Sequence, residues 1–179
     1  PAECSQAGFS QTACGFVVEF TDIITDLQLN SIDTNQGGWA NSQLHRIVNT
    51  NIYNSFPQDL KNVIKDTKVV SSYGVADSSN LISSDKLYLL STKEVWGKEG
   101  TSDVINNDTS DNQTRQLDYY KKENVTTDNY SGAIKKNRYW WLRSAVANNN
   151  NLFFAVTANG NFITGNAINY SGVSPAFRI

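Results

Sequence analysis

Proline, histidine and cysteine are scarce in this chain of 179 residues, and methionine is absent. The only histidine is His45, and the two cysteines, Cys4 and Cys14, lie close together near the N-terminus. Because a structural zinc site needs about four nitrogen or sulfur ligands, two thiols and one imidazole do not make one, and we predict no metal and no cofactor. The cysteine spacing is consistent with a local disulfide in an exported protein and equally with two separate, partly buried thiols.

Charge is also limited. Charged residues make up 18% of the chain, and the formal net charge is −2. Lysine and arginine are scattered, so the chain lacks the basic surface by which proteins bind nucleic acid or anionic membranes, and we expect no nucleic-acid partner. No apolar run approaches the roughly 20 residues of a membrane-spanning helix, so we expect no membrane insertion by this segment.

The motifs of common enzymes are missing as well. There is no Gly-x-Ser-x-Gly elbow, no phosphate-binding glycine loop and no His-Glu-x-x-His helix, and His45 has no nucleophile motif beside it. We therefore interpret His45 as a solvated or capping residue and expect no catalytic function. Paired carboxylates for glycoside cleavage remain an alternative, because their pairing is spatial. The acidic residues that could supply them lack the alternation of a calcium loop and favour a solvated loop: Asp103, Asp108, Asp111 and Asp118.

What the chain does contain is abundant asparagine, serine, threonine and glycine, which is typical of a loop-rich α+β fold. Its length allows one domain with a substantial core. We expect an N-terminal segment over residues 1–14 and a single domain over 15–179.

Hydrophobic patterning places the expected elements. Helices are predicted over 41–53, capped by Asn41 or Ser42, from Pro57 onward, and over 92–96, where Ser91 and Glu94 form a capping-box pattern. We interpret 72–85 as a polar loop and 98–137 as ordered insert loops. Apolar or alternating runs predict strands over 15–20, 68–71, 86–90, 139–142, 152–156, 162–163 and 173–179.

The stretch from Tyr139 to Ile179 joins two kinds of composition. Its two ends are rich in aromatic and β-branched residues, which favour buried strands. Its middle holds four consecutive asparagines, 148–151, and an Ala-Asn-Gly-Asn sequence at 158–161 that predicts a hairpin turn. A polar segment carried between rigid strands is how a binding surface is usually displayed.

Several motifs resemble one known family. They are Gly37-Gly38-Trp39, Tyr-Asn-x-x-Pro-x-x-Leu-Lys at 53–61, Asp85–Ser91 followed by Glu94-Val95, Gln116–Tyr120, Trp141–Ser144 and Gly172–Arg178. Together they resemble C-type-lectin-fold domains of bacterial surface proteins and phages, over nearly the whole chain from about Cys14. The C-terminal end most resembles the variable proteins of diversity-generating retroelements, whose ligand-binding residues are rewritten by mutagenic reverse transcription. The resemblance implies a C-type-lectin-like fold, with two helices packed on small antiparallel sheets and long insert loops.

The genetic code supports this resemblance. In such retroelements adenines are mutated, so an AAC asparagine codon can become most amino acids but never Lys, Glu, Gln, Met or Trp. Residues 145–171 contain none of these five, although four of them occur upstream. We therefore predict that 145–171 is the variable ligand-binding region.

The chain also departs from other proteins of this fold. It has no Glu-Pro-Asn or Gln-Pro-Asp sequence, which the calcium-dependent sugar-binding lectins use, and its last cysteine is Cys14, whereas the sulfatase-activating enzymes need late cysteines. The resemblance therefore implies binding without calcium-lectin or oxidase chemistry. It also implies an extracellular location, on a bacterial cell surface or a phage particle, and a protein or glycan ligand on a cell surface.

Our leading prediction is a non-catalytic domain in which Trp140–Ser144 and Val173–Arg178 hold the exposed side chains of 145–171. Core packing remains an alternative for Phe154 and Ile168. A fixed adhesin or carbohydrate-binding module is the alternative function, and a hydrolase that uses the insert carboxylates is a more distant one. The predicted ligand contacts are Asn148, Asn149, Asn150, Phe154, Thr157, Asn159, Asn161, Thr164, Asn166, Ile168, Asn169 and Tyr170.

Overall fold

The computed structural model describes residues 1–97 and 108–179, and its helices are short. The α-helices are α1 (Gly38–Asn41), α2 (Gln43–Ile47), α3 (Gln58–Val63), α4 (Thr92–Trp96) and α5 (Asp118–Lys122). A π-helical turn, η3 (Val48–Ile52), continues α2. The 3-10 turns are η1 (Ala2–Ser5), η2 (Gln11–Ala13), η5 (Asp111–Gln113) and η6 (Ser131–Ala133).

The strands of the described residues form three sheets. One pairs β1 (Val17–Glu19) with β9 (Ala176–Arg178), and another pairs β3 (Thr67–Gly74) with β4 (Asp77–Asp85). The third has the order β2-β8-β5-β6-β7, with β2 (Thr25–Leu27), β8 (Ser171–Val173), β5 (Trp140–Ala145), β6 (Leu152–Val156) and β7 (Phe162–Asn166). Its pairs are antiparallel except β5 with β8, which run parallel. The expected α+β class is therefore confirmed.

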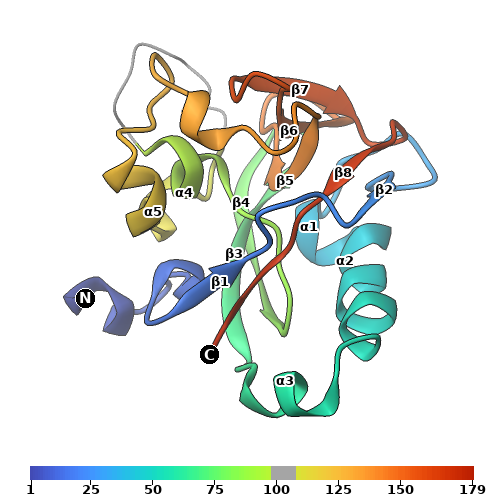
Figure 1. Ribbon diagram of the computed structural model, residues 1–179. Coiled ribbons are helices and arrows are strands. Elements are labelled where there is room, and N and C mark those ends of the chain that lie inside the picture. The colour runs from blue at the N-terminus through green and yellow to red at the C-terminus, as the bar shows by residue number, and fades with distance from the viewer. Residues whose placement is uncertain (98–107) are drawn as a thin grey trace.

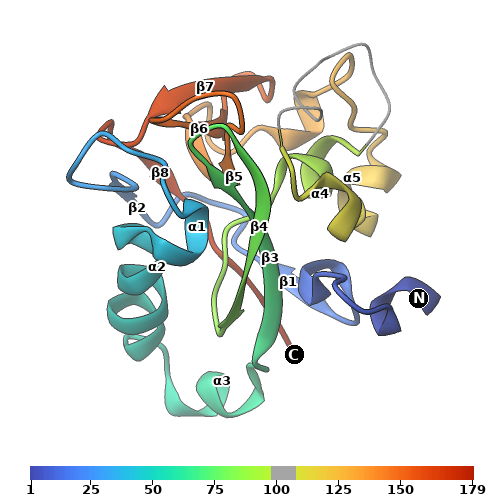
Figure 2. The same ribbon diagram turned by 180° about the vertical axis from the view of Figure 1, so that it is seen from behind.

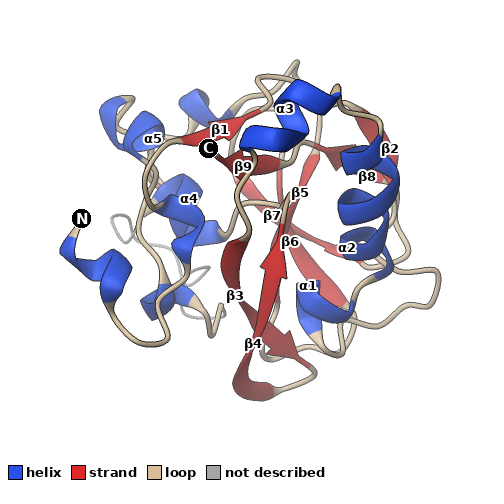
Figure 3. Cartoon of the chain, turned by 90° about the horizontal axis from the view of Figure 1, so that it is seen from below, coloured by secondary structure: helices blue, strands red, loops and turns tan. Residues whose placement is uncertain are grey.

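The helices lie on two sides of the strands. Viewed from below, α1 to α3 lie on one side and α4 and α5 on the other (Figure 3). The views from front and back both place β7 at the end of the molecule opposite α3 (Figures 1 and 2). Between these layers all four tryptophans are buried. This core separates the 145–171 region from the α3 end.

Side-chain caps mark the first residues of two helices, α2 and α4. The Ser42 hydroxyl accepts a hydrogen bond from the His45 N–H, so Ser42 is the cap of α2. At α4 the Ser91 side chain accepts from the Glu94 N–H while the Glu94 carboxylate accepts from the Ser91 N–H, which is the expected capping box. Such caps satisfy main-chain donors that the first helical turn leaves unpaired. Pro57 caps α3 and is not its first helical residue.

Two strand predictions were wrong. The stretch 77–85 was predicted to be part of a loop, but it forms β4. Its hydrogen bonds to β3 stabilise the strand, and its polar composition does not indicate this pairing. The apolar run 86–90 is instead an extended buried segment with one bridge, from Tyr88 to Ala176. Its Leu87, Leu89 and Leu90 are fully buried, so tertiary packing accounts for the hydrophobicity.

The N-terminal segment belongs to the folded core. Cys4 and Cys14 form a disulfide, which settles the alternative that the sequence left open. Ala13 is buried in the core, and the Thr12 carbonyl accepts a hydrogen bond of 2.8 Å from the Tyr88 hydroxyl. The expected boundary after residue 14 is therefore not a break in packing.

Candidate ligand-binding surface

The predicted contact residues differ in exposure. Seven of the twelve are exposed: Asn148, Asn150, Asn159, Thr164, Ile168, Asn169 and Tyr170. Asn149, Thr157, Asn161 and Asn166 are half-buried. Tyr170 is the most prominent large side chain of the region, with 71% of its surface exposed.

Phe154 is the correction to the predicted set. Its side chain is 3% exposed and belongs to the hydrophobic core, as does the neighbouring Phe153. Strand β6 lies between β5 and β7 and is buried over residues 153–156, so its alternating side chains find protein on both faces. The alternative of core packing therefore holds for Phe154, whereas Ile168 is 42% exposed.

The remaining residues gather at the two ends of the β6–β7 hairpin. At one end, residues 146–151, which we call the Asn loop, meet the 167–170 turn, because the Ala167 N–H donates to the Asn151 carbonyl at 2.9 Å. At the other end lies the hairpin tip, residues 157–161. Five-residue strands separate these ends by about 13 Å, with Thr164 on β7 between them. The predicted site is therefore a ridge and not a single pocket.

Asn35 holds the Asn loop by its main chain. The Asn35 side chain is fully buried, and its Nδ2 lies 3.1, 3.0 and 2.9 Å from the carbonyl oxygens of Val146, Asn149 and Leu152. The Asn35 N–H donates to the carbonyl of Asn150 at 2.9 Å. These bonds go to carbonyl groups, which every residue type provides, so they do not require particular side chains in the loop. The Asn149 side chain adds a local contribution, because its Oδ1 accepts from the N–H groups of Asn151 and Leu152 at 2.8 and 3.1 Å.

Asp33 joins the Asn loop to the end of β7. Its Oδ2 accepts hydrogen bonds of 2.8 Å from the side-chain amides of Asn151 and Asn166. The Asn166 amide, opposed by a smaller effect of burial and reinforced by Asn151, lowers the pKa of Asp33 below its ordinary value of 3.8. The charged carboxylate therefore links two residues of 145–171. Sequence reasoning missed both Asp33 and Asn35, since 33–38 reads only as a loop.

The hairpin tip is ordered mainly by its own side chains. The Thr157 hydroxyl donates to Asn159 Oδ1, and the Asn161 Oδ1 accepts from the Phe162 N–H at 2.8 Å. Gly160 turns the chain with a φ of 91°, and its carbonyl accepts from the Trp96 indole N–H at 3.3 Å. The predicted turn is confirmed, and Asn159 remains the exposed side chain at its apex.

Beside Tyr170 the surface is hollowed. A shallow depression of about 400 Å³ is lined by Asp26, Arg138, Tyr139, Tyr170 and Gly172 among others. Tyr139 is half-exposed and precedes β5, and its carbonyl accepts from the Gly172 N–H at 3.0 Å. An ion pair of Arg138 with Asp26 borders the depression. Only part of this lining belongs to 145–171.

A buried ion pair stiffens the strand below the surface. Residues 142–144 bulge out of β5, so that the Arg143 N–H reaches the Leu90 carbonyl at 2.9 Å. The Arg143 guanidinium is fully buried and contacts both carboxylate oxygens of Glu94, at 2.5 and 3.0 Å. Trp140–Ala145 is buried throughout.

The alternative enzyme residues do not share one environment. Asp108 is buried and accepts from the hydroxyls of Thr92, Ser110 and Ser144. Asp118 is exposed and paired with Arg115 at 2.8 Å. Asp111 lies 3.9 Å from the ammonium of Lys93, and Asp103 lies outside the described residues.

His45 is neither solvated nor a helix cap. Its Nε2 lies 2.8 Å from the carboxylate of Asp85, and the other oxygen of Asp85 accepts from the Trp39 indole N–H at 2.8 Å. The Asp85 carboxylate is fully buried, while the His45 side chain is 19% exposed. His45 therefore pairs with a buried carboxylate and ties α2 to the end of β4.

These features define a small α+β domain that displays a polar ridge whose central loop is held by its main chain. The chain belongs to the family described as a domain of unknown function, DUF6273, which matches residues 18–179. No curated protein and no solved structure matches the chain. Within residues 1–97 and 108–179, no helix is long and apolar enough to cross a membrane.

Proposed function

We propose that this chain is a non-catalytic ligand-binding domain of C-type-lectin-like fold, whose surface is diversified by a retroelement. The ligand is a protein or a glycan on a cell surface, and no cofactor takes part. The contacts come from the eleven predicted residues that remain after Phe154 is assigned to the core. Their tyrosine and asparagine side chains supply contact area and adaptable hydrogen bonds, the combination that antibody loops use.

The observation that carries the proposal is the hold of Asn35 on the Asn loop. Asn35 lies outside 145–171 and binds the carbonyls of Val146, Asn149 and Leu152. Asn30 acts similarly at the neighbouring turn, where its N–H donates to the Ala167 carbonyl at 3.0 Å. The bonds that Asn35 makes persist when the loop side chains change, because carbonyl groups are present at every residue. Exposed positions such as Asn148 and Asn150 can therefore change without loss of these bonds.

The separation of side chains along 145–171 supports the same conclusion. The exposed positions are asparagine, threonine, isoleucine and tyrosine, all reachable from an AAC codon, while Phe153, Phe154 and Val156 are buried. Mutagenesis confined to the first set alters the surface and leaves the core intact. The C-type-lectin-like assignment rests on the sequence motifs, and short helices beside two small antiparallel sheets and one mixed five-stranded sheet are consistent with it.

The disulfide supports the proposed location. Cys4 and Cys14 are joined, and disulfides persist in oxidising environments such as the cell surface. This agrees with display on a bacterial cell or a phage particle.

The flanking DNA tests the proposal. We expect a near-copy of the coding region for 145–171 beside a reverse transcriptase gene, with mismatches that fall at adenines of the copy. Mismatches spread over all four bases, or the absence of any copy, would contradict the retroelement.

A fixed carbohydrate-binding module is the second candidate, and the depression beside Tyr170 favours it. Tyr139, one of the two aromatic residues that line it, lies outside 145–171, and the lining also includes Arg138 and Asp26, which form an ion pair. A glycan array probed with the intact protein separates the two functions. Binding of one glycan class that is lost in Tyr139→Ala and kept in Asn148→Ala favours the fixed module.

A further inference from the structure

Among the residues that the structure describes, strand β1 pairs along one edge only, with β9. The Ile179 N–H donates to the Phe16 carbonyl at 3.1 Å, and the Phe20 N–H donates to the Pro175 carbonyl at 3.3 Å. Because alternate residues of an antiparallel strand bond to the partner, the main-chain groups of Val17 and Glu19 point away from β9. Within the described part of the chain, neither residue uses these groups in a hydrogen bond. Two N–H donors and two carbonyl acceptors are therefore open at this edge.

An apolar groove runs beside the open edge. A depression of about 390 Å³ lies between β1 on one side and Tyr119, Tyr120, Ala133 and Ile134 on the other. A second depression, of about 210 Å³, shares Val17, Glu19 and Tyr119 with it, so the hollow continues along the strand. We call the two together the edge groove. A volume of this size is typical of a ligand-binding pocket.

The polar groups of the edge groove leave one acceptor unmatched. Glu19 Oε1 accepts from the Tyr120 hydroxyl at 2.7 Å and from the Lys135 ammonium at 3.1 Å. Lys135 also donates to the Phe20 carbonyl and the Ser174 hydroxyl, so its charge is fully engaged. Glu19 Oε2 is buried and has no hydrogen-bond partner among the residues that the structure describes. A complementary occupant therefore brings a donor, and preferably a cation.

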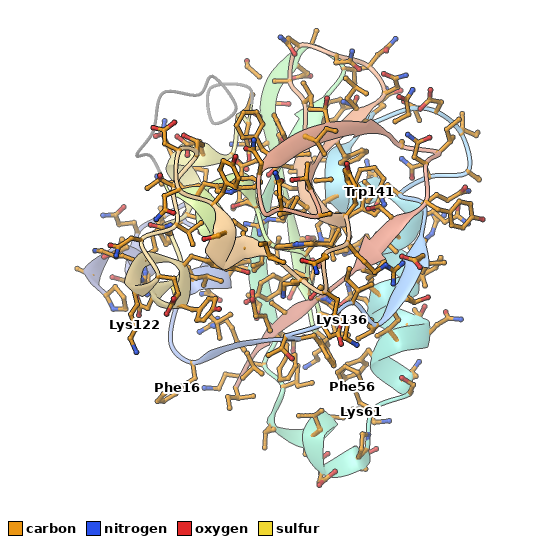
Figure 4. All side chains as sticks on the ribbon, turned by 45° about the horizontal axis from the view of Figure 1, so that its top comes forward. Phe16, Phe56, Lys61, Lys122, Lys136 and Trp141 are labelled. Carbon is orange, nitrogen blue, oxygen red and sulfur yellow. A yellow bond between two sulfur atoms is a disulfide. The ribbon has the colours of Figure 1, made fainter. Side chains whose placement is uncertain are left out.

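Exposed apolar side chains surround the groove. Phe16 is 79% exposed and Tyr119 57% exposed, with Val18 and Ile134 also classed as exposed. Figure 4 shows the Phe16 side chain projecting outward from the turn before β1. Apolar groups gathered beside a free strand edge are a feature of protein interaction sites.

We propose that the edge groove binds an extended peptide segment of a partner protein, which adds to β1 as a strand. The peptide main chain bonds to Val17 and Glu19, one apolar side chain enters the hollow between Tyr119 and Ile134, and a basic side chain faces Glu19. Strand addition uses main-chain bonds for affinity and side-chain pockets for specificity. A small apolar molecule would fill the hollow but leave the alternating donors and acceptors open. This site uses none of residues 145–171 and is independent of the proposed function.

The test is a selection of random nine-residue peptides displayed on phage against the intact protein, followed by affinity measurement with fluorescent synthetic copies. We expect enriched peptides with alternating apolar and basic residues. Methylation of the peptide nitrogens, one at a time, should weaken binding about tenfold at every second position, because only alternate N–H groups face β1. Peptides that tolerate N-methylation throughout, or the enrichment of none, overturn the proposal.

Variants of the protein place the binding site. Val17→Pro removes an outward N–H that has no partner in the fold, so binding should fall about tenfold while circular dichroism and thermal unfolding show a folded domain. Val63→Thr makes a conservative change at an exposed residue of α3 that does not line the edge groove, and it should bind as the wild type does. Glu19→Gln should remove the preference for basic peptides. Binding lost in Tyr170→Ala and kept in Val17→Pro would assign the peptide to the 145–171 surface and overturn the proposal, as would self-association through β1 without peptide binding.

Discussion

The side-chain amide of Asn35 lies 2.9 Å from the carbonyl oxygen of Leu152, where the Asn loop enters β6. The same amide reaches the carbonyls of Val146 and Asn149, so one buried side chain spans the loop from its start to its end. Gly74 packs against Asn35 so closely that an added Cβ would lie 2.5 Å from the Asn35 carbonyl oxygen. A residue outside 145–171 therefore helps to set the position of the loop.

Replacing Asn35 should destabilise the protein far more than replacing a loop asparagine. Asn35→Ala leaves buried carbonyls without donors, and we expect the free energy of unfolding to fall by about 3 kcal/mol. The matched control is Asn150→Ala, which removes an exposed side chain and keeps the carbonyl, with an expected change within about 0.5 kcal/mol. Urea unfolding measures both. Equal losses in the two variants would show that Asn35 does not hold the loop.

Acid should loosen the contact of Asp33 with the variable region. The Asn166 amide, with Asn151, lowers the pKa of Asp33 below 3.8, so its stabilising contribution is present above the unfolded pKa and is lost as the pH falls through the lower folded value. The side-chain amide resonances of Asn151 and Asn166 should shift together in an NMR titration below pH 3.8. In Asp33→Asn, which has no titrating carboxyl, the same amides should show no such transition; a transition that persists there arises from another group.

The Glu94–Arg143 pair should be costly to break and inexpensive to replace. Burial alone would raise the pKa of Glu94, but the charge and hydrogen bonds of Arg143 outweigh it and lower the pKa below 4.5. Glu94→Gln leaves a buried guanidinium without its counter-charge, and we expect a loss of about 3–5 kcal/mol. The double variant Glu94→Gln with Arg143→Met should lose less than the sum of the single variants, measured by urea unfolding at pH 7. Strict additivity would contradict the coupling.

The acid dependence of stability follows from the same pair. Because the folded pKa of Glu94 is lowered, its contribution is present above the unfolded value of 4.5 and declines as the pH falls through the folded value. The free energy of unfolding of the wild type should therefore fall more steeply below pH 4.5 than that of Glu94→Gln, in which the contribution is absent at every pH. Equal slopes in the two proteins would show that another carboxyl dominates acid unfolding.

The sequence predicted those elements whose local chemistry is sufficient. Ser42 and the Ser91–Glu94 box marked helix starts, and Gly160 marked the hairpin. It failed at β4, because a strand of serine, asparagine and aspartate is stabilised by its neighbour β3 and carries no periodic pattern. At 86–90 the apolar run predicted a paired strand, but the segment is buried without forming one. A buried extended segment and a buried strand have the same apolar composition, so the sequence does not distinguish them.

The candidate site was predictable in outline for a similar reason. Composition separated the exposed asparagines from the aromatic residues at the two ends of 139–179. It did not show whether Phe154 is buried or exposed, because the sequence of β6 does not reveal that neighbouring elements cover both of its faces. Asn35 and Asp33 escaped detection because their partners lie more than a hundred residues away along the chain. Such long-range hydrogen bonds leave no local signal.

Two glycines in 145–171 give the sharpest test of retroelement diversification. At Gly160 the φ is 91° and an added Cβ would lie 2.1 Å from the Tyr130 carbonyl oxygen, and at Gly165 it would lie 2.8 Å from the Trp141 ring. Codon by codon, we therefore expect adenine-directed mismatches between the gene and its near-copy at exposed positions such as Asn148, Asn150 and Tyr170. The codons for Gly160 and Gly165 should match in both copies.

Protein variants check the physical basis of that pattern. Gly160→Ala should lower the free energy of unfolding by about 1–3 kcal/mol, because a side chain at this φ is strained and meets the Tyr130 main chain. The control, Asn148→Ala, changes an exposed residue of 145–171 and should cost about 0.5 kcal/mol or less. Two results together would contradict this expectation: mismatches at the Gly160 codon, and a Gly160→Ala protein with an unchanged free energy of unfolding. They would show that the backbone conformation at Gly160 does not limit diversification of 145–171.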